Sequence, residues 1–302
     1  MNPAANTTGH FRSRELEASL ELGGWTLDVP VVLDSPPFPP DFPPMKFSLK
    51  EKWVLITGAS SGFGAAAAKA FAEEGARLLL GARREDRLKE VADEAKKAGA
   101  AEAHSHFLDV AKTETVEKFI AWAKEKTGSI HVLINNAGGA QGLDTIAQGK
   151  DADWEAMLQS NVLGILRMTR ATLPLIPRDA GASIINIGSI AGYSAYEGGA
   201  VYCAAKAAEL QITRTLRLEL FGTGIRVSSV NPGLAETEFS LVRFKGDAAA
   251  AKKLYEGTHP LTASDIAEIL LWVATRPPHV NIDDLIVKPV DQAAVGKVFK
   301  RP

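Results

Sequence analysis

The stretch Trp53-Val-Leu-Ile-Thr-Gly-Ala-Ser-Ser-Gly-Phe-Gly64, continued by Ala65-Ala-Ala-Ala-Lys-Ala-Phe-Ala72, decides the fold. Its first five residues form a short apolar run that is typical of a buried strand. The alanine-rich segment favours a helix, which Gly75 closes. The stretch therefore predicts a strand, a glycine-rich loop and a helix in immediate succession.

The loop between this strand and this helix holds residues that we expect to bind a dinucleotide. Its glycines allow a tight turn and the close approach of a pyrophosphate to a helix N-terminus, where free N–H groups and the helix dipole favour an anion. The first gap between glycines is three residues, longer than in the common G-x-G-x-x-G pattern. A plain strand-to-helix turn is the alternative. The candidate residues are Gly58, Ser60, Ser61, Gly62, Phe63 and Gly64.

The same alternation of apolar runs and amphipathic stretches continues to the end of the chain. Strands alternating with helices of ten or more residues imply a parallel sheet covered on both faces. We therefore predict the α/β class, with a Rossmann-type doubly wound parallel sheet of about seven strands in a single domain. The further strands are expected at 77–81, 103–108, 131–135, 183–187, 225–230 and 284–287, and the helices at 85–98, 113–127, 151–173, 200–221 and 264–275.

The end of the second strand distinguishes NADP from NAD. A carboxylate there would accept hydrogen bonds from the ribose 2′-hydroxyl of NAD. The chain instead has Gly81-Ala82 at this point, followed by Arg83 and Arg84. Two guanidinium groups suit a 2′-phosphate, so we predict NADP as the cofactor. A solvated pair of charges at a helix start is the alternative.

A candidate catalytic set lies further along the chain. Tyr202 and Lys206 are four residues apart in Tyr-Cys-Ala-Ala-Lys, and Ser189 lies thirteen residues upstream. On a helix, positions i and i+4 stack on one face, so a phenol would share its face with a fixed positive charge. The cation favours phenolate, and the pair is therefore predicted to donate and accept a proton near neutral pH.

These motifs occur in the order used by one enzyme family. From about Phe47 to Val290 the chain resembles a short-chain dehydrogenase/reductase. The resemblance implies hydride transfer between a nicotinamide cofactor and an alcohol or carbonyl substrate. It rests on the glycine loop, Asn135-Asn-Ala-Gly138, Asn161, Ser189, Tyr202, Lys206 and Asn231-Pro-Gly233.

The resemblance also implies roles for single residues. Asp109 would contact the adenine edge, and a turn or helix-cap role is also open for it. Asn161 would kink its helix and hold a water that relays protons to Lys206; without the resemblance it is an exposed helix residue. Lys206 would steady the phenolate of Tyr202 and bind the nicotinamide ribose. The other implied cofactor contacts are Asn136, Ala137, Gly138, Pro232, Gly233 and Thr237, of which Thr237 is equally plausible as a helix cap.

The substrate class rests on two further segments, 237–247 and 278–282. They are similar to the branch of the family that oxidises 3-hydroxy acids, including serine and allo-threonine. Arg243 and Lys245 fall where the family builds a substrate lid, and arginine matches a carboxylate bidentately. Both cations are equally well explained as solvated lid charges. Gln141 is expected on the opposite wall of the substrate site.

We thus expect hydride transfer between NADP(H) and a small, serine-like 3-hydroxy acid or its 3-oxo product. One rival keeps the chemistry and changes the substrate to a neutral ketone, aldehyde or sugar. Another is a non-catalytic NADP-binding regulator, against which the intact Ser189, Tyr202 and Lys206 argue.

Composition excludes several other classes of function. The 302 residues are 46% apolar and 23% charged, as in a soluble globular enzyme, and the formal charge of −2 gives no basis for nucleic-acid binding. No apolar run is long enough to span a membrane. The single cysteine excludes a disulfide framework and fits a reducing, cytoplasmic setting, and the six histidines lack metal-ligand spacing, so we expect no metal. Apolar residues in the helices 151–173 and 200–221 predict a homo-oligomer, a tetramer or a dimer.

Residues 1–45 differ in amino-acid composition from the rest of the chain. They carry a net charge of −4 and eight of the sixteen prolines, including Pro36-Pro-Phe-Pro-Pro-Asp-Phe-Pro-Pro44. Such a stretch cannot propagate a helix or join a central strand, and it predicts an extended, flexible N-terminal extension. The apolar segments Leu16–Leu22 and Trp25–Leu33 are suited to docking on a neighbouring subunit. The NADP-binding catalytic domain is expected to span residues 46–302.

Overall fold

The computed structural model describes residues 16–22, 25–31, 46–178 and 181–301. The chain divides into two compact units, Met1–Pro44 and Met45–Pro302. In the first unit, β1 (Leu16–Leu22) pairs antiparallel with β2 (Trp25–Val31), and Leu22 lies opposite Trp25 at the turn. These two segments thus form a hairpin where the sequence predicts an extended arm. The proline-rich stretch Pro36–Pro44 lies outside the described residues.

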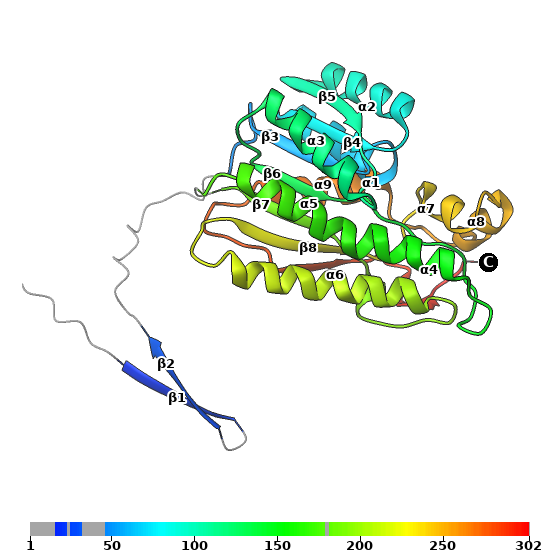
Figure 1. Ribbon diagram of the computed structural model, residues 1–302. Coiled ribbons are helices and arrows are strands. Elements are labelled where there is room, and N and C mark those ends of the chain that lie inside the picture. Colours follow the sequence, from blue (N-terminus) through cyan, green and yellow to red (C-terminus); the bar gives the residue numbers. More distant parts are fainter. Residues whose placement is uncertain (1–15, 23–24, 32–45, 179–180, 302) are drawn as a thin grey trace, which may run out of the picture. The chain divides into compact units, whose positions relative to one another are not determined.

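A seven-stranded parallel sheet organises the second unit (Figure 1). Its strand order is β5-β4-β3-β6-β7-β8-β9, and each neighbouring pair is parallel. This confirms the predicted α/β class and the doubly wound, Rossmann-type single domain. The strands are β3 (Trp53–Thr57), β4 (Arg77–Ala82), β5 (Glu102–Phe107), β6 (Val132–Asn135), β7 (Ser183–Ile187), β8 (Arg226–Pro232) and β9 (Asp284–Val287).

Helices cover the sheet on both faces, which explains why the central strands are apolar throughout and do not alternate. In β3, Val54 and Ile56 pack toward one face, against α1 (Gly62–Glu73), α2 (Glu85–Ala98) and α9 (Ala263–Ala274). Leu55 packs toward the other face, with α3 (Thr113–Lys126), α5 (Gly164–Thr172) and α6 (Ala200–Glu219). Figure 1 shows α3, α5 and α6 in front of the sheet.

The strand order reverses between β3 and β6. The chain runs outward from β3 through β4 to β5, then returns to the other side of β3 and proceeds from β6 to β9. Open α/β sheets bind ligands outside the carboxyl ends of their strands at such a switch point. The glycine loop follows β3 and Asn136-Ala-Gly138 follows β6, so the fold brings these two motifs together.

The helix predicted at 151–173 is interrupted in its middle. It consists of α4 (Asp151–Leu158), a π-helical turn at Gln159–Leu163, then α5, and it ends in a 3₁₀ turn at Leu173–Leu175. Asn161 lies at the centre of the π-helical turn and is buried, with a relative exposure of 1%. It is therefore not the exposed helix residue that the local pattern alone suggests. π-turns of this kind commonly occur at functional sites.

Two short helices in the segment after β8 were not predicted from the sequence. They are α7 (Glu238–Arg243) and α8 (Ala248–Tyr255). The Thr237 hydroxyl accepts the Phe239 N–H at the start of α7, and the Asp247 carboxylate accepts the Ala250 N–H at the start of α8. A small β10–β11 ribbon (Gln292–Ala294 and Lys297–Val298) follows β9. Within the described residues, no helix has the length and apolarity needed to cross a bilayer.

Candidate active site

A cavity of about 470 Å³ opens at the carboxyl ends of the central strands, within the size range of small-molecule and cofactor sites. Most of the residues predicted for the site line it. Four do not: Gly64, Asn161, Arg243 and Lys245. The predicted residues that line it are Gly58, Ser60, Ser61, Gly62, Phe63, Arg83, Arg84, Asp109, Asn136, Ala137, Gly138, Gln141, Ser189, Tyr202, Lys206, Pro232, Gly233 and Thr237.

Main-chain geometry shapes the loop after β3. Gly58 has φ +65° and Gly62 has φ +53°, conformations that side chains disfavour. A Cβ at Gly64 would lie 2.5 Å from the Gly58 carbonyl oxygen, so only glycine fits where α1 begins. Gly62 and Phe63, the first residues of α1, line the cavity, so the helix N-terminus lies where an anionic pyrophosphate is favoured.

Thr57 and Asn136 join this loop to the one after β6. The Thr57 hydroxyl accepts the N–H groups of Asn136 (3.0 Å) and Ala137 (2.9 Å). In return, the Asn136 side-chain amide donates to the carbonyls of Thr57 and Gly58. The two loops that meet at the switch point are therefore one rigid unit.

Arg84 lies at the side of the cavity formed by the end of β4. It donates to the hydroxyls of Ser60 (3.3 Å) and Ser61 (2.6 Å) and pairs with Glu238 of α7 at 2.8 Å. Hydrogen bonding to Arg84, aided by Arg87, holds the pKa of Glu238 below its usual range. Arg83 is exposed and lines the cavity beside it. The glycine cradle and these guanidinium groups together fit a dinucleotide with a 2′-phosphate.

The candidate catalytic residues converge on the other side of the cavity. The Ser189 oxygen accepts the Ala191 N–H at 3.1 Å, so its own hydroxyl proton remains available to donate. Tyr202 is 9% exposed and packs against Phe239 of α7, with 5.7 Å between ring centroids. Ser189 follows β7 and Tyr202 lies in the first turn of α6. The sheet edge and the start of one helix thus bring the two hydroxyls to the same cavity.

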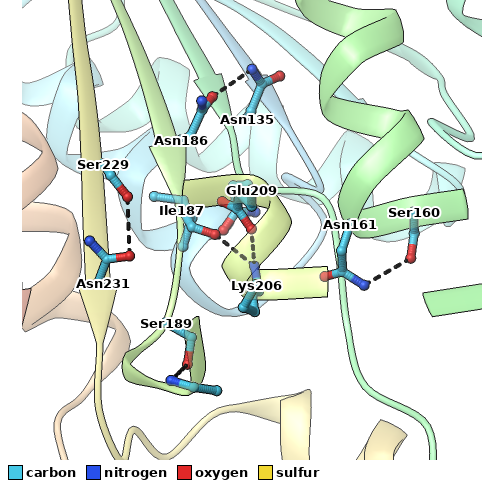
Figure 2. A network of polar contacts seen from close by, with 12 residues as sticks. Asn135, Ser160, Asn161, Asn186, Ile187, Ser189, Lys206, Glu209, Ser229 and Asn231 are labelled. Carbon is cyan, nitrogen blue, oxygen red and sulfur yellow. Dashed lines mark hydrogen bonds and ion pairs between the residues drawn. The ribbon is translucent and has the colours of Figure 1, made fainter. Parts of the chain in front are cut away.

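Lys206 is held from beneath by two acceptors. Figure 2 shows its ammonium between the Ile187 carbonyl (2.8 Å) and the carboxylate of Glu209 (2.7 Å). Burial alone lowers the pKa of Lys206, but the attraction of Glu209 and Tyr202 outweighs it, and the net direction is upward. Burial raises the pKa of Glu209 to about 7, although Lys206 opposes that rise. On acidification, Glu209 is therefore the partner that loses its charge first.

Glu209 was not predicted from the sequence to belong to the site. A signal was present, because Glu209 lies three residues after Lys206 and therefore on the same face of the helix. Asn186 accepts from Asn135 (Figure 2) and donates to Thr213, so further buried polar side chains are joined by hydrogen bonds near this pair.

Asn161 braces the loop after β6. Its side-chain amide donates to the carbonyls of Gly139 and Met157, and its carbonyl oxygen accepts the Gly139 N–H at 3.1 Å. A Cβ at Gly138 would lie 2.5 Å from that carbonyl oxygen. The π-helical turn thus sets Asn161 directly against the loop that lines the cavity.

Arg243 lies against Tyr202. Its guanidinium carbon is 5.6 Å from the ring centroid of Tyr202 and 5.2 Å from that of Tyr196. Nε donates to the Gly142 carbonyl and Nη2 donates to the Tyr196 hydroxyl. Burial, only partly offset by Arg243, raises the pKa of Tyr196 to about 12, so Tyr196 remains a neutral partner. Lys245, in contrast, pairs with Asp153 at 2.7 Å.

Two other predicted cofactor residues have structural contacts as well. Asp109 accepts the Ala111 N–H in a turn, and Thr237 caps α7, while both line the cavity. A Cβ at Gly233 would lie 2.2 Å from the side-chain oxygen of Gln292. Across the described parts of the chain, no cluster of His, Cys, Asp and Glu is arranged to hold a metal ion.

Comparison with known proteins agrees with this geometry. The model of the short chain dehydrogenase family matches residues 52–246, a range that contains the glycine loop, Ser189, Tyr202, Lys206 and Arg243. The sequence is 47% identical to sulfoacetaldehyde reductase 2 of Chromohalobacter salexigens over 241 residues, which are 80% of this chain and 95% of that protein.

Two further similarities concern related substrates. The chain is 42% identical over 245 residues to an NADP-dependent 3-hydroxy acid dehydrogenase of Escherichia coli K12, covering 80% of this chain and 97% of that protein. The solved structure of the closed form of serine dehydrogenase complexed with NADP+ superposes with a TM-score of 0.76 at 40% identity, covering 83% of this chain and 100% of that one.

Proposed function

This chain belongs to the short-chain dehydrogenase/reductase family, and from that premise we propose that it is an oxidoreductase that transfers a hydride between NADP(H) and a small 3-hydroxy acid or its 3-oxo product. The observation that carries the proposal is the placement of Arg243 5.6 Å from the ring of Tyr202. A group that binds anions thus lies directly behind the ring of Tyr202, which lines the cavity.

The chain's own residues manage the proton and the orientation. The Ser189 hydroxyl donates to the substrate oxygen, because its proton is free while its oxygen accepts the Ala191 N–H. Tyr202 removes the hydroxyl proton in oxidation and returns it in reduction. Lys206 supplies the positive charge that favours the phenolate form. When bound, NADP(H) accepts or supplies the hydride.

The cofactor is held by the loops at the switch point. The cradle of Gly58, Gly62 and Gly64 receives the pyrophosphate at the N-terminus of α1, and Arg83 and Arg84 meet the 2′-phosphate. Arg84 also donates to Ser60 and Ser61, which places it against the glycine loop and not free in solvent. Asn161 supports the loop at Gly138 and, as the resemblance implies, holds a proton-relaying water near Lys206.

Arg243 is the better of the two predicted cations for the substrate carboxylate. Two of its nitrogens are fixed by Gly142 and Tyr196, and Nη1 has no hydrogen-bond partner among the described residues. A 3-hydroxy acid carries its carboxylate two bonds from the carbinol carbon, within reach of both Tyr202 and this nitrogen. Lys245 is already paired with Asp153. Gln141 forms the facing wall.

A second candidate substrate keeps this geometry and changes the anion. The relative from Chromohalobacter salexigens is named for sulfoacetaldehyde, in which a sulfonate occupies the place of the carboxylate, one methylene away from the reacting carbonyl. A guanidinium group binds either anion through paired hydrogen bonds. Both candidates therefore require the same cation beside Tyr202.

A substrate screen tests the proposal. We expect serine, 3-hydroxyisobutyrate, 3-hydroxypropionate and 2-hydroxyethanesulfonate to reduce NADP, followed by absorbance, far better than 1-propanol, which lacks only the anion. NAD in parallel tests the cofactor assignment. Faster turnover of 1-propanol or of sugars would favour a neutral substrate, and tight NADPH binding without any turnover would identify a regulator.

The domain division and assembly are proposed on separate grounds. The chain starting at Met45 should fold and work alone, since residues 45–302 form a compact unit. The exposed Leu158, Leu163 and Leu166 of the α4–α5 segment suit a homotetramer or dimer in the cytoplasm. Light scattering of the full and shortened chains tests both points; a monomer, or a drop in melting temperature on truncation, would contradict them.

A further inference from the structure

The most unusual group near the cavity is the carboxylate of Glu209. Its side chain is entirely buried, with a relative exposure of 0%, and one oxygen pairs with Lys206 at 2.7 Å. The other oxygen, Oε1, has no hydrogen-bond partner in the described structure. A buried carboxylate costs several kcal/mol unless it is compensated, so its presence beneath a catalytic lysine calls for a function.

Counting donors shows what Glu209 does to Lys206. An ammonium group has three N–H donors. One is taken by the Ile187 carbonyl and one by Glu209, and both acceptors are buried. Lys206 lines the cavity, so the third donor is the one left for a ligand there. Glu209 and Ile187 therefore fix the direction of the remaining donor.

We propose that Glu209 is a positioning residue that orients Lys206 and sets the charge balance of the Tyr202–Lys206 pair. The inference rests on the proposed function and extends it. With Glu209 ionised, the phenol form of the set is neutral and the phenolate form carries one negative charge. Glu209 thus opposes phenolate formation through its charge and favours the ammonium form of Lys206.

The other charged groups around α6 are paired elsewhere or lie beyond Tyr202, so the charge effect on Lys206 comes from its immediate neighbours. The charges that act on Lys206 are those of Glu209 and Tyr202, and Lys206 is the charge that acts on Glu209. On the elements packed against α6, Asp153 of α4 is paired with Lys245, and Arg226 of β8 donates to backbone carbonyls. The π-helical turn and β7 present Asn161 and Asn186, which do not titrate. Beyond Tyr202 lie Arg243, Tyr196 and Cys203.

Glu209→Gln tests the inference, because it keeps the shape and removes the charge. Losing a nearby negative charge makes both neighbours give up protons more readily. We therefore expect both limbs of the pH profile of kcat to move to lower pH by about half a unit or more. Glu209→Asp, which keeps the charge, should leave the limbs in place even if activity falls. Glu219→Gln, at the exposed end of the same helix, is the matched control.

Two results would overturn the inference: the limbs of the kcat–pH profile stay in place in Glu209→Gln, or they move equally in Glu219→Gln. A purely structural role would change the rate or the stability and leave the pH profile of kcat unchanged. Glu209→Met replaces the glutamine variant if that variant does not fold. A readout without turnover is the phenolate absorbance of Tyr202, obtained by subtracting Tyr202→Phe, which should titrate at lower pH in Glu209→Gln. A wild-type protein that oxidises no hydroxy acid would refute the proposed function, and this titration would still decide the role of Glu209.

Discussion

The cavity has two halves that are built in different ways. The cofactor half is lined by the loop 58–63 and by residues 83–84 and 136–138, and the other half, called the lid half, by Gln141 and by Glu238, Phe239 and Val242 of α7. In the cofactor half, the main chain makes the shape, as the excluded Cβ at Gly64 shows. The lid half is held by side chains that are distant in sequence, such as Lys245 with Asp153 and Arg243 with Tyr196. Backbone-built sites can thus be predicted from neighbouring residues, whereas side-chain-built sites cannot.

The largest effect is expected where the halves meet. Tyr202→Phe removes the proton donor and keeps the ring that packs on Phe239. Turnover should fall by about a thousandfold, while NADPH affinity, measured by fluorescence titration, stays near wild type. Activity within about tenfold of wild type would remove Tyr202 from its proposed role. A similar loss of NADPH affinity would mean that Tyr202 also contributes to cofactor binding, so that turnover and cofactor binding cannot be assigned to different halves of the cavity.

The stability of the protein should depend on pH through Glu209, which lies next to Lys206. Burial raises the pKa of Glu209 to about 7. The free energy of unfolding is therefore highest below the ordinary pKa of a glutamate, where Glu209 is protonated in both the folded and the unfolded protein. It falls as the pH rises through 7. The raised pKa of Lys206 acts only at higher pH. Urea denaturation should show Glu209→Gln gaining about 3 kcal/mol in unfolding free energy over wild type between about pH 4.5 and pH 8. A constant difference would contradict the assignment.

Arg243→Ala probes the lid half alone. Losing a hydrogen bond to a charged group costs about 1.5–3 kcal/mol, so the KM for 3-hydroxy acids should rise about tenfold to a hundredfold. The KM for 1-propanol and the affinity for NADPH should change little. Arg276→Ala, which removes an arginine that stacks on Trp272, is the control. Equal losses on charged and neutral substrates would indicate a collapsed lid and not a lost anion contact.

Replacing Arg83 and Arg84 together by alanine probes the cofactor half through its charges. Binding of NADP should weaken by about tenfold or more, whereas binding of NAD should hardly change, because only NADP carries the 2′-phosphate. Isothermal titration with both cofactors measures the ratio directly. If both weaken alike, these arginines support the loop and do not recognise the phosphate.

The smallest effect is expected from a single methyl group in the cradle. Gly64→Ala places a Cβ 2.5 Å from the Gly58 carbonyl, which should cost about 1–3 kcal/mol of stability and weaken NADP binding several-fold. Gly128→Ala, where a Cβ meets nothing within 4 Å, is the matched control. Thermal unfolding and NADP titration compare the two. If Gly64→Ala has the same melting temperature and NADP affinity as wild type, the main chain does not determine the shape of the cofactor half.

The elements that were predicted correctly have local causes. The run 53–57 is apolar because both faces of β3 are buried, and Gly99 ends α2 in the left-handed conformation that favours glycine. The glycine loop, Ser189, Tyr202 and Lys206 could be located because each lies next to a strand or helix whose pattern is clear. Their arrival at one cavity follows from the parallel topology.

The elements that were missed depend on long-range contacts. α7 is a short helix without a repeating apolar face, and it is placed by bonds from Glu238 and Arg243 to distant loops. The π-helical turn at Gln159–Leu163 was expected only as the kink at Asn161 that the resemblance implies, and the apolar pattern of 151–173 alone does not predict it. The β1–β2 hairpin lies beside proline-rich sequence that dominated the prediction.

Glu238 has a consequence that reaches across both halves. It belongs to the lid helix α7, yet its carboxylate bridges Arg84 and Arg87 at the far side of the cavity. If the 2′-phosphate binds Arg84 as proposed, it competes with Glu238 for the same guanidinium, and cofactor affinity and the position of α7 are then thermodynamically linked. Linkage is reciprocal: if NADP changes the affinity for substrate by some factor, substrate changes the affinity for NADP by that same factor. NAD, which lacks the phosphate, leaves this coupling unused.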